Sequence, residues 1–452
     1  PTWLAIGALV ALAVASLVLP APVTYDAWGW LQWGREVGRL DLDTTAGPAW
    51  KPLPVLATTV LSLFGDLAPV LWQVAARATG LLALVGAYRV AARFAGSAAG
   101  VLAAAALVLI PDSEARLFRL LAEAHTGPLE AALTLWWIEL HLEERTTGAF
   151  AAGVALALLR PEAWPFLLVY GVWLWRRRPQ TRRLLVGGAV IVPLLWFGGD
   201  WWGSGSPWNG SSEAQVYRDA IATRAGRALS RLGDVVIVPV WVAAVGGVLS
   251  AWRRRDRPLV LIAGAGAVWA ALVVAMSAVL GYAALSRFLI PTAAIVCVLA
   301  GIGVVRAVRA VPAGPTRALA MAAMAVLTVP FAWPRLAELG DAVREIPARA
   351  ELDHDLDTAI ERAGGTEIVL SCGRVAIDNS GAANGARPAL GWKLDLPMSR
   401  VSRRLGEKGG VMFARVGRRD DAALAGAPAT TTRPLARTEH WAVYAVGCPD
   451  SA

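Results

Sequence analysis

A succession of apolar segments, each about 15 to 25 residues long, runs through residues 1–333 and is interrupted by short loops that carry arginines. A helix of this length crosses the hydrocarbon core of a bilayer, and a helix satisfies its own backbone polar groups there. We therefore predict a polytopic α-helical membrane protein with about eleven transmembrane helices. The predicted spans are residues 3–20, 68–89, 95–111, 125–142, 147–160, 161–175, 184–200, 233–251, 258–280, 288–305 and 316–333.

The composition agrees with this class, because 56% of the residues are hydrophobic, 17% are charged and the mean hydropathy is +0.51. The formal net charge of +9 is compatible with nucleic-acid binding, but the arginines lie in short loops rather than along one soluble face. We expect membrane lipids, and no nucleic acid, around this chain. Many of the 21 tryptophans flank apolar segments, where the ring rests at headgroup level.

The basic loops predict how the chain is oriented, since arginine and lysine concentrate on the cytoplasmic side. Arg89 and Arg93 share a side with the later basic loops only if the apolar stretch KPLPVLATTVLSLFG, residues 51–65, does not cross the membrane. We therefore predict that 51–65 is an interfacial helix, following the amphipathic stretch 28–37, within one exterior loop, 21–67. The later basic loops are residues 176–183, 253–257 and 306–317.

Residues 335–452 carry frequent charges and no spanning segment, so we separate them from a membrane domain, residues 1–333. By the same parity they lie outside the cytoplasmic membrane. A helical pattern ends at Gly364 and Gly365, and three stretches read as strands, which predicts a small α/β domain. The predicted strands are TEIVLSCG, GVMFARV and EHWAVYAVGC.

Two cysteines, Cys372 and Cys448, end two of these predicted strands. An exterior compartment permits oxidation, so we predict a disulfide between them. Cys297 lies inside an apolar segment and is interpreted as a packing residue.

Asp26 follows the first apolar segment in the sequence TYDAWGWLQWGRE and is the first candidate for chemistry. At the outer end of a membrane helix, a carboxylate can meet both a lipid-linked substrate and an aqueous acceptor. The alternative is structural: the carboxylate caps the helix that follows it. The residues alone do not separate these two interpretations.

Two cations are candidates for phosphate binding. Lys51 precedes Pro52 at the start of the predicted interfacial helix, and Arg287 lies in SRFLIP at the outer start of a late helix. A guanidinium can bind phosphate oxygens in a bidentate manner. The alternative is that both are ordinary interfacial cations that extend to lipid headgroups.

Four further residues are candidates for positioning a substrate. Glu123 and His125 end the charged part of residues 111–130, at the mouth of an apolar helix where ionisable groups are costly and often functional. Arg160 and Glu162, in LLRPEAWPF, lie between two short spans, and the alternative is that they pair only with each other. Asp41 and Asp43 are more consistent with a solvated loop than with a metal site, and four histidines in all disfavour a histidine-rich site.

The order of these motifs resembles the GT-C class of membrane glycosyltransferases over most of residues 1–333. Protein mannosyltransferases and aminoarabinose transferases have a similar exterior aspartate, a KPPL-like element before an interfacial helix that ends in LFG, and an R-[FY]-L-x-P motif. LLRPEAW is similar to a feature of actinobacterial arabinofuranosyltransferases. This chain departs from the pattern by carrying KPLP, and by having Ala27 where several relatives have a second acidic residue.

The resemblance implies that Asp26 is a general base and that Lys51 and Arg287 contact the phosphate of a polyprenyl-phosphate sugar. A single base opposite the leaving group implies inversion. The sugar would be arabinofuranose or a hexose, and the acceptor a cell-envelope glycan or lipid. No metal or other cofactor is implied by the residues.

Other functions remain open on the sequence alone. A flippase or transporter of lipid-linked sugars would share the helices and the basic loops, although no inverted repeat is evident. A non-enzymatic scaffold of envelope assembly would depend on residues 335–452. Within the enzymes, a ligase that uses diphosphate donors is a further alternative.

Overall fold

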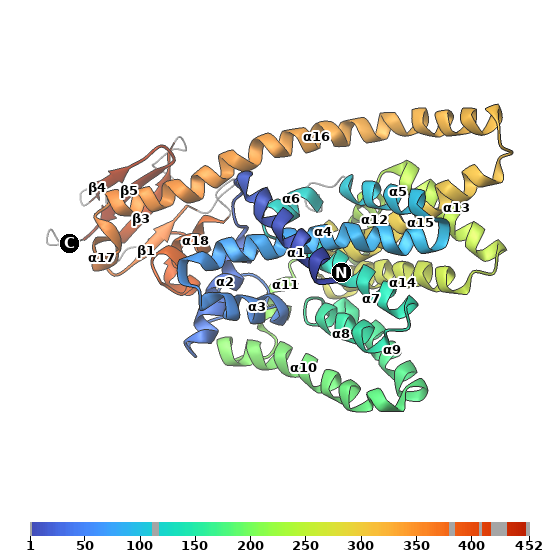
Figure 1. Ribbon diagram of the computed structural model, residues 1–452. Helices are drawn as coiled ribbons and strands as arrows, with labels where there is room; N and C mark the ends of the chain where they lie inside the picture. Colours follow the sequence, from blue (N-terminus) through green and yellow to red (C-terminus); the bar gives the residue numbers. More distant parts are fainter. Residues whose placement is uncertain (1, 111–116, 379–384, 406–408, 417–431, 449–452) are drawn as a thin grey trace.

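The computed structural model describes residues 2–110, 117–378, 385–405, 409–416 and 432–448, so the charged residues 111–116 lie outside the described part. It consists of a helical body and a small sheet domain at one end of that body (Figure 1). The predicted fold class is confirmed.

Each predicted span coincides with a helix. In the described part of the chain, five helices are long and apolar enough to cross a membrane, or six if α12 and α13, which meet at 86°, form one broken span. The count of eleven therefore stays a prediction. The helices up to α9 are α1 (Thr2–Ala15), α2 (Tyr25–Gly38), α3 (Pro52–Ser62), α4 (Ala68–Ala95), α5 (Ser97–Val108), α6 (Leu117–Ala122), α7 (Gly127–Leu142), α8 (Thr146–Ala157) and α9 (Trp164–Arg177). They are followed by α10 (Arg182–Ser204), α11 (Asn209–Ala214), α12 (Ile221–Asp234), α13 (Val238–Arg253), α14 (Arg257–Leu280), α15 (Ile290–Ala310) and α16 (Pro315–Arg362).

Helix α15 is the centre of the body and is buried along most of its length among α4, α5, α13 and α14. Small residues allow this close packing. A Cβ at Gly301 would collide with the Ala99 carbonyl oxygen of α5, and one at Gly303 with the Ala243 carbonyl oxygen of α13. Because lipid is as apolar as a helix surface, such close backbone approach is what holds membrane helices together.

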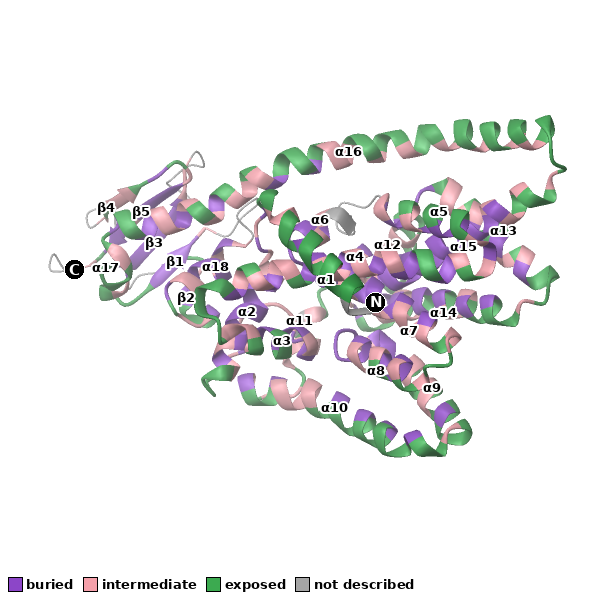
Figure 2. Cartoon of the chain, viewed as in Figure 1, coloured by how far each residue is buried: buried purple, intermediate pink, exposed green. Residues whose placement is uncertain are grey.

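Helix α16 is continuous over 48 residues, so the predicted boundary near residue 334 falls inside it. Its apolar first part is exposed along the body, and its last turns enter the sheet domain (Figure 2). One helix therefore runs from the end of the body that carries the basic loop 306–317 to the C-terminal domain.

The C-terminal sheet has the order β2-β1-β3-β5-β4. Strand β1 is parallel to β2 and β3, whereas β5 is antiparallel to β3 and β4. The predicted strands GVMFARV and EHWAVYAVGC are confirmed by β3 and β5. The strands are β1 (Val375–Ile377), β2 (Val401–Ser402), β3 (Gly410–Arg415), β4 (Thr432–Arg437) and β5 (Trp441–Val446).

The third predicted strand, TEIVLSCG, is wrong: these residues form helix α17 (Gly365–Ser371). Gly364 and Gly365 have φ angles of 102° and 84°, so the chain turns after α16 and starts a new helix. A run of three apolar residues has no period that separates a strand from a helix. The predicted disulfide is confirmed, and Cys372 reaches Cys448 from the end of this helix, with a Cα–Cα distance of 5.5 Å.

The C-terminal domain packs against α2. Helix α18 (Ala386–Lys393) lies on α2, where Arg35 donates to the Trp392 carbonyl at 3.0 Å and stacks on its ring. Trp28 Nε1 donates to Asp353 of α16 at 3.4 Å. These contacts attach α2, the helix that carries Asp26, to α18 and to the last part of α16.

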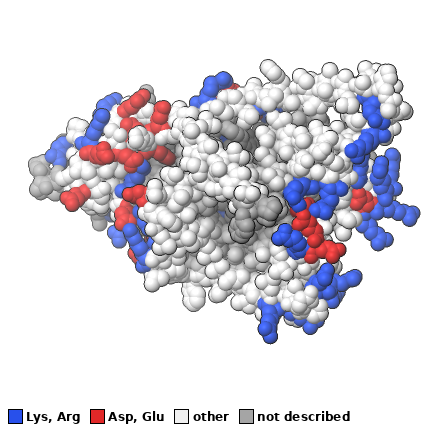
Figure 3. Space-filling model, in the orientation of Figure 1, with Lys and Arg blue, Asp and Glu red and all other residues white. Residues whose placement is uncertain are grey.

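Charged side chains divide the molecule into zones. On the face in Figure 3, arginines gather at the end of the body remote from the C-terminal domain, and few charges lie between the two ends. Helices α4, α9, α13 and α15 all end at these arginines, which include Arg93, Arg177, Arg253 and Arg309.

Candidate functional site

Asp26 lies in the first turn of α2, and Thr24 is the residue that caps this helix. The Thr24 side chain accepts a hydrogen bond from Ala27 N–H at 3.4 Å, and Thr24 N–H donates to the Glu123 carbonyl at 3.2 Å. The capping role considered for Asp26 is therefore filled by another residue. The carboxylate is left to face the interior of the site.

Asp26 faces His125 and Arg287. Its Oδ2 lies 3.3 Å from His125 Nε2 and 3.3 Å from Arg287 Nη1. His125 precedes α7, and Arg287 lies in the turn η5 (Ser286–Leu289) before α15. Three segments that are distant in the sequence thus meet at one carboxylate, whose side chain is 16% exposed.

The backbone fixes the protonation of His125. Gly127 N–H donates to His125 Nδ1 at 3.2 Å, so Nδ1 carries no proton. The neutral ring then has its proton on Nε2, which lies 3.3 Å from Asp26 Oδ2 and 3.0 Å from Arg287 Nη1, and of these two only the carboxylate oxygen can accept it. Burial, together with Arg287 and Lys51, lowers the pKa of His125 to about 4, although its hydrogen bond to Asp26 acts in the opposite direction.

Lys51 and Arg160 are positioned by the same local device. Each is an extended residue directly before a proline that starts a helical turn, with φ of −141° and −142°. The residue before a proline is disfavoured in the helical conformation and adopts an extended one. Its side chain therefore points away from the helical turn that follows. Leu53 N–H donates to the Leu158 carbonyl at 3.1 Å, and this bond brings the two proline turns together.

The contacts of Lys51 place it beside Asp26. Its Nζ lies 3.5 Å from Thr126 Oγ1 and 5.1 Å from the centre of the Trp30 ring. Trp30 also meets the His125 ring edge-on, with the ring centres 6.1 Å apart. The indole thus contacts both the lysine and the histidine.

Arg160 forms its ion pair with Glu130. The alternative pair with Glu162, its near neighbour in the sequence, is not formed. Arg160 Nε lies 2.9 Å from Glu130 Oε1, and both side chains are buried. Thr126 Oγ1 donates to the same carboxylate oxygen at 3.2 Å. Glu162 is also buried, and the cations Arg160 and Lys51 act on it electrostatically.

Glu130 and Thr126 were missed in the sequence. An acidic residue in the first turn of an apolar helix is ordinary at a helix N-terminus. The usable signal was the spacing of four between Thr126 and Glu130, which aligns both side chains on the face that Arg160 approaches.

Glu123 is separate from this cluster. It binds Arg119 at 2.9 Å and Arg349 of α16 at 3.3 Å, and it therefore ties the α6–α7 turn to the long helix. Asp43 accepts hydrogen bonds from Thr45, at 2.9 Å from its N–H, and from Ser399. Over the described residues, no three acidic, histidine or cysteine side chains form a group that could hold a metal ion.

The electrostatics of the site are dominated by its cations. Burial alone would raise the pKa of Asp26, but Arg287, the hydrogen bond from His125 and the charge of Lys51 hold it well below its ordinary value. Burial and the nearby Arg160 lower the pKa of Lys51 to about 7. Arg160 Nη2 and Arg287 Nε are buried without a hydrogen-bond partner among the described residues. Two guanidinium donors are thus available to an anion.

Two solved structures have the same architecture. The crystal structure of ArnT from Cupriavidus metallidurans in the apo state is 15% identical, with a TM-score of 0.57 and coverage of 98% of either chain. ArnT from the same organism bound to undecaprenyl phosphate is 16% identical, with a TM-score of 0.59, and 100% of this chain and 99% of that chain are covered. The chain has the ArnT fold. This likeness confirms the predicted fold, a GT-C-like helical body with a small C-terminal sheet domain.

No family model matches the sequence, and no curated protein matches it. The ArnT fold is therefore shown by the structure alone.

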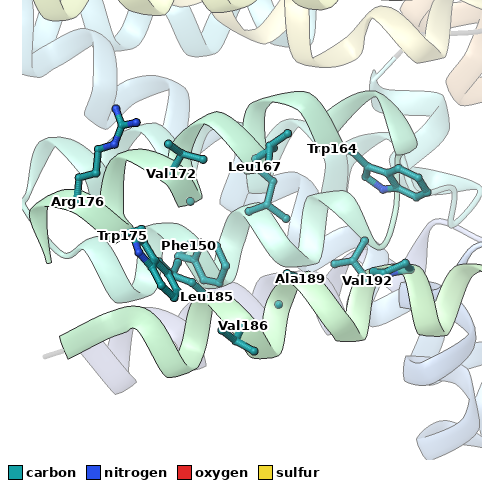
Figure 4. A pocket seen from close by; sticks show the side chains of 14 residues that line it. Phe150, Trp164, Leu167, Val172, Trp175, Arg176, Leu185, Val186, Ala189 and Val192 are labelled. Atoms are coloured by element: carbon teal, nitrogen blue, oxygen red, sulfur yellow. The ribbon is translucent and has the colours of Figure 1, made fainter. Parts of the chain in front are cut away.

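Within this ArnT-like body, an apolar groove of about 550 Å³ lies between α8, α9 and α10 (Figure 4). Trp164 lies at one end, four residues after Arg160, and Trp175 and Arg176 lie at the other. Leu168 on its wall is largely exposed, so the groove opens toward lipid. Along α9 the groove is about 18 Å long, by the rise of a helix over twelve residues.

Proposed function

We propose that this chain is a GT-C-type glycosyltransferase that moves a sugar from a polyprenyl monophosphate to a cell-envelope acceptor. One observation carries the proposal: the Asp26 carboxylate faces Arg287 beside Lys51, while two buried guanidinium nitrogens, on Arg160 and Arg287, have no hydrogen-bond partner among the described residues. A base beside a cluster of cations suits displacement of a phosphate leaving group.

Asp26 is the general base in this proposal. The acceptor hydroxyl gives its proton to the Asp26 carboxylate while its oxygen bonds to the anomeric carbon. The bond from that carbon to the phosphate oxygen breaks on the opposite face, so the configuration inverts. The hydrogen bond from His125 Nε2–H keeps the carboxylate in place.

Donor binding strengthens this base. In the free site, Arg287 and Lys51 lower the basicity of Asp26 by holding its charge. A donor phosphate on the same cations screens that attraction, and the pKa of Asp26 then rises toward its ordinary value. The carboxylate thus becomes a better proton acceptor when the reacting sugar is present.

Lys51, Arg160 and Arg287 stabilise the departing polyprenyl phosphate. The negative charge on the leaving oxygen grows as the glycosidic bond breaks, and preorganised cations in a partly dry site bind that charge more strongly than water does. Glu130 and Glu162 neutralise part of the positive charge when no donor is bound.

The groove between α8 and α10 suits the polyprenyl chain of the donor. It starts at Trp164, next to the cation cluster, and its lining is almost entirely apolar. ArnT has been crystallised with undecaprenyl phosphate, an isoprenoid of this class. A donor held in this way has its sugar phosphate at the cations and its chain in the membrane.

The orientation follows from the two ends of the body. Helices α7 and α15 begin at the site and run toward the basic end, which the positive-inside rule assigns to the cytoplasm. The site and the domain of residues 335–452 then lie outside the cytoplasmic membrane. A lipid-linked sugar is available there and a nucleotide sugar is not. Arabinofuranose or a hexose is the proposed sugar, and a glycan or lipid of the envelope the acceptor.

A donor screen with the purified protein in detergent tests the function. We expect sugar release from a polyprenyl monophosphate carrying arabinofuranose or a hexose, and none from diphosphate-linked or nucleotide-linked sugars. Donors with a shortened prenyl chain should need higher concentrations. If the protein in vesicles moves lipid-linked sugar across the bilayer but turns over no donor, it is a transporter instead.

The pH dependence of donor use tests the role of Lys51. Lys51 is charged below its pKa of about 7, and the donor phosphodiester keeps one negative charge throughout this range. The KM for the donor should therefore rise with pH, by up to about tenfold per unit above about pH 7. In Lys51→Arg the cation stays charged and this rise should disappear. An identical pH profile for both proteins would exclude Lys51 from the phosphate site.

A further inference from the structure

Helix α12 presents a row of arginines to the body. Arg224, Arg227 and Arg231 are spaced by three and four residues, so they share one face of the helix. Ile221 and Leu229 are exposed. Arginines that face inward on an amphipathic surface helix can donate hydrogen bonds to the segments beneath the helix.

Arg231 binds the segment that leads to Arg287. Its Nη1 donates to the Ala283 carbonyl at 2.6 Å and to the Ala284 carbonyl at 3.2 Å. Its Nη2 donates to the Tyr217 hydroxyl at 3.4 Å. One planar guanidinium thus bridges two carbonyls and a hydroxyl, an arrangement that a lysine ammonium does not reproduce.

The segment that Arg231 binds is irregular and needs such support. Residues 281–285 join α14 to η5 and have no regular secondary structure. Ala284 has φ of 42°, a left-handed conformation that is unfavourable for alanine. Tyr217 N–H also donates to the Gly281 carbonyl at 3.0 Å, and the Tyr217 carbonyl accepts from Arg224 at 3.3 Å.

Arg287 follows this segment after a single residue, Ser286. On its other side, Trp269 Nε1 donates to the Phe288 carbonyl at 2.9 Å, so the turn is anchored at both ends. We infer that Arg231 is a positioning residue that sets where the Arg287 guanidinium meets Asp26 and the donor phosphate. This inference rests on the proposed function, because it assumes that Arg287 binds that phosphate.

The test measures binding of undecaprenyl phosphate to the full-length protein in detergent, through quenching of its tryptophan fluorescence. Arg287→Ala should weaken binding about tenfold, which is about 1.4 kcal/mol. Arg231→Gln should weaken it by a similar factor, and Arg231→Lys by less. Arg218→Gln is the matched control. Arg218 is exposed on the adjoining segment, and this substitution removes one positive charge from the same surface.

The double variant Arg231→Gln, Arg287→Ala separates positioning from general damage. If Arg231 acts through Arg287, its loss adds little once Arg287 is gone, and the two effects are not additive. Additive effects, or an Arg231→Gln variant that binds like Arg218→Gln, would overturn the inference. If Arg287→Ala itself binds normally, the phosphate role in the proposed function fails first. Arg231→Lys keeps the test decisive should Arg231→Gln not fold.

Discussion

Replacing Asp26 by asparagine is expected to slow sugar transfer by about 10²- to 10⁴-fold, the range that a positioned general base contributes. Asparagine keeps the shape of the side chain, and its carbonyl oxygen still accepts the hydrogen bond from His125 Nε2–H. What it loses is the ability to take a proton. The loss should therefore appear in kcat, with the KM for the donor changed little.

Donor binding is the control for this substitution. The Asp26 carboxylate competes with the donor phosphate for Arg287, at 3.3 Å from its Nη1. Removing the charge should leave the affinity for undecaprenyl phosphate unchanged or increase it. Asp41→Asn, at an exposed carboxylate of the same loop, should transfer sugar at the native rate. If Asp26→Asn also turns over normally, the base lies elsewhere.

Replacing Glu130 by alanine is expected to lower the free energy of unfolding by about 3 to 5 kcal/mol, the cost of leaving a buried cation unpaired. Glu130 is the ion-pair partner of Arg160 at 2.9 Å, and both side chains are buried. Denaturant unfolding of the protein in mixed micelles, followed by tryptophan fluorescence, would measure the change.

A paired replacement distinguishes the charge from the packing. In Glu130→Met, Arg160→Met, the ion pair is removed as a unit, apolar volume is retained and Glu162 keeps Lys51 as a nearby cation, so most of the stability should return. Donor turnover should stay low, because one phosphate-binding cation is missing. A double variant as unstable as Glu130→Ala would mean that Glu130 supports the fold through its packing instead.

The helices of the body followed from the sequence because long apolar segments separated by basic loops predict membrane helices. Lys51 and Arg160 could also be found, since a cation directly before a proline projects away from the helix that begins there. Their meeting was not visible in the sequence. It depends on the bond between Leu53 and Leu158, a contact over more than 100 residues.

Other features had local signals that were weak or misleading. TEIVLSCG has strand-forming residues, but the glycines before it allow a turn into a short helix, and this local geometry prevailed. Helix α12 was not predicted, although Arg224, Arg227 and Arg231 alternate with apolar residues at a helical period. Its arginines lower its hydropathy below that of a membrane span.

The 48 residues of α16 make a continuous helix of about 72 Å, more than twice the hydrocarbon thickness of a bilayer. Its apolar start is set by the membrane, and Asp353 and Arg349 near its other end are set by Trp28 and Glu123. The length of the helix therefore sets the distance between its apolar start and the C-terminal domain. In the proposed orientation, the number of turns in α16 sets the height of the C-terminal domain above the lipid, and with it the room for an acceptor over Asp26.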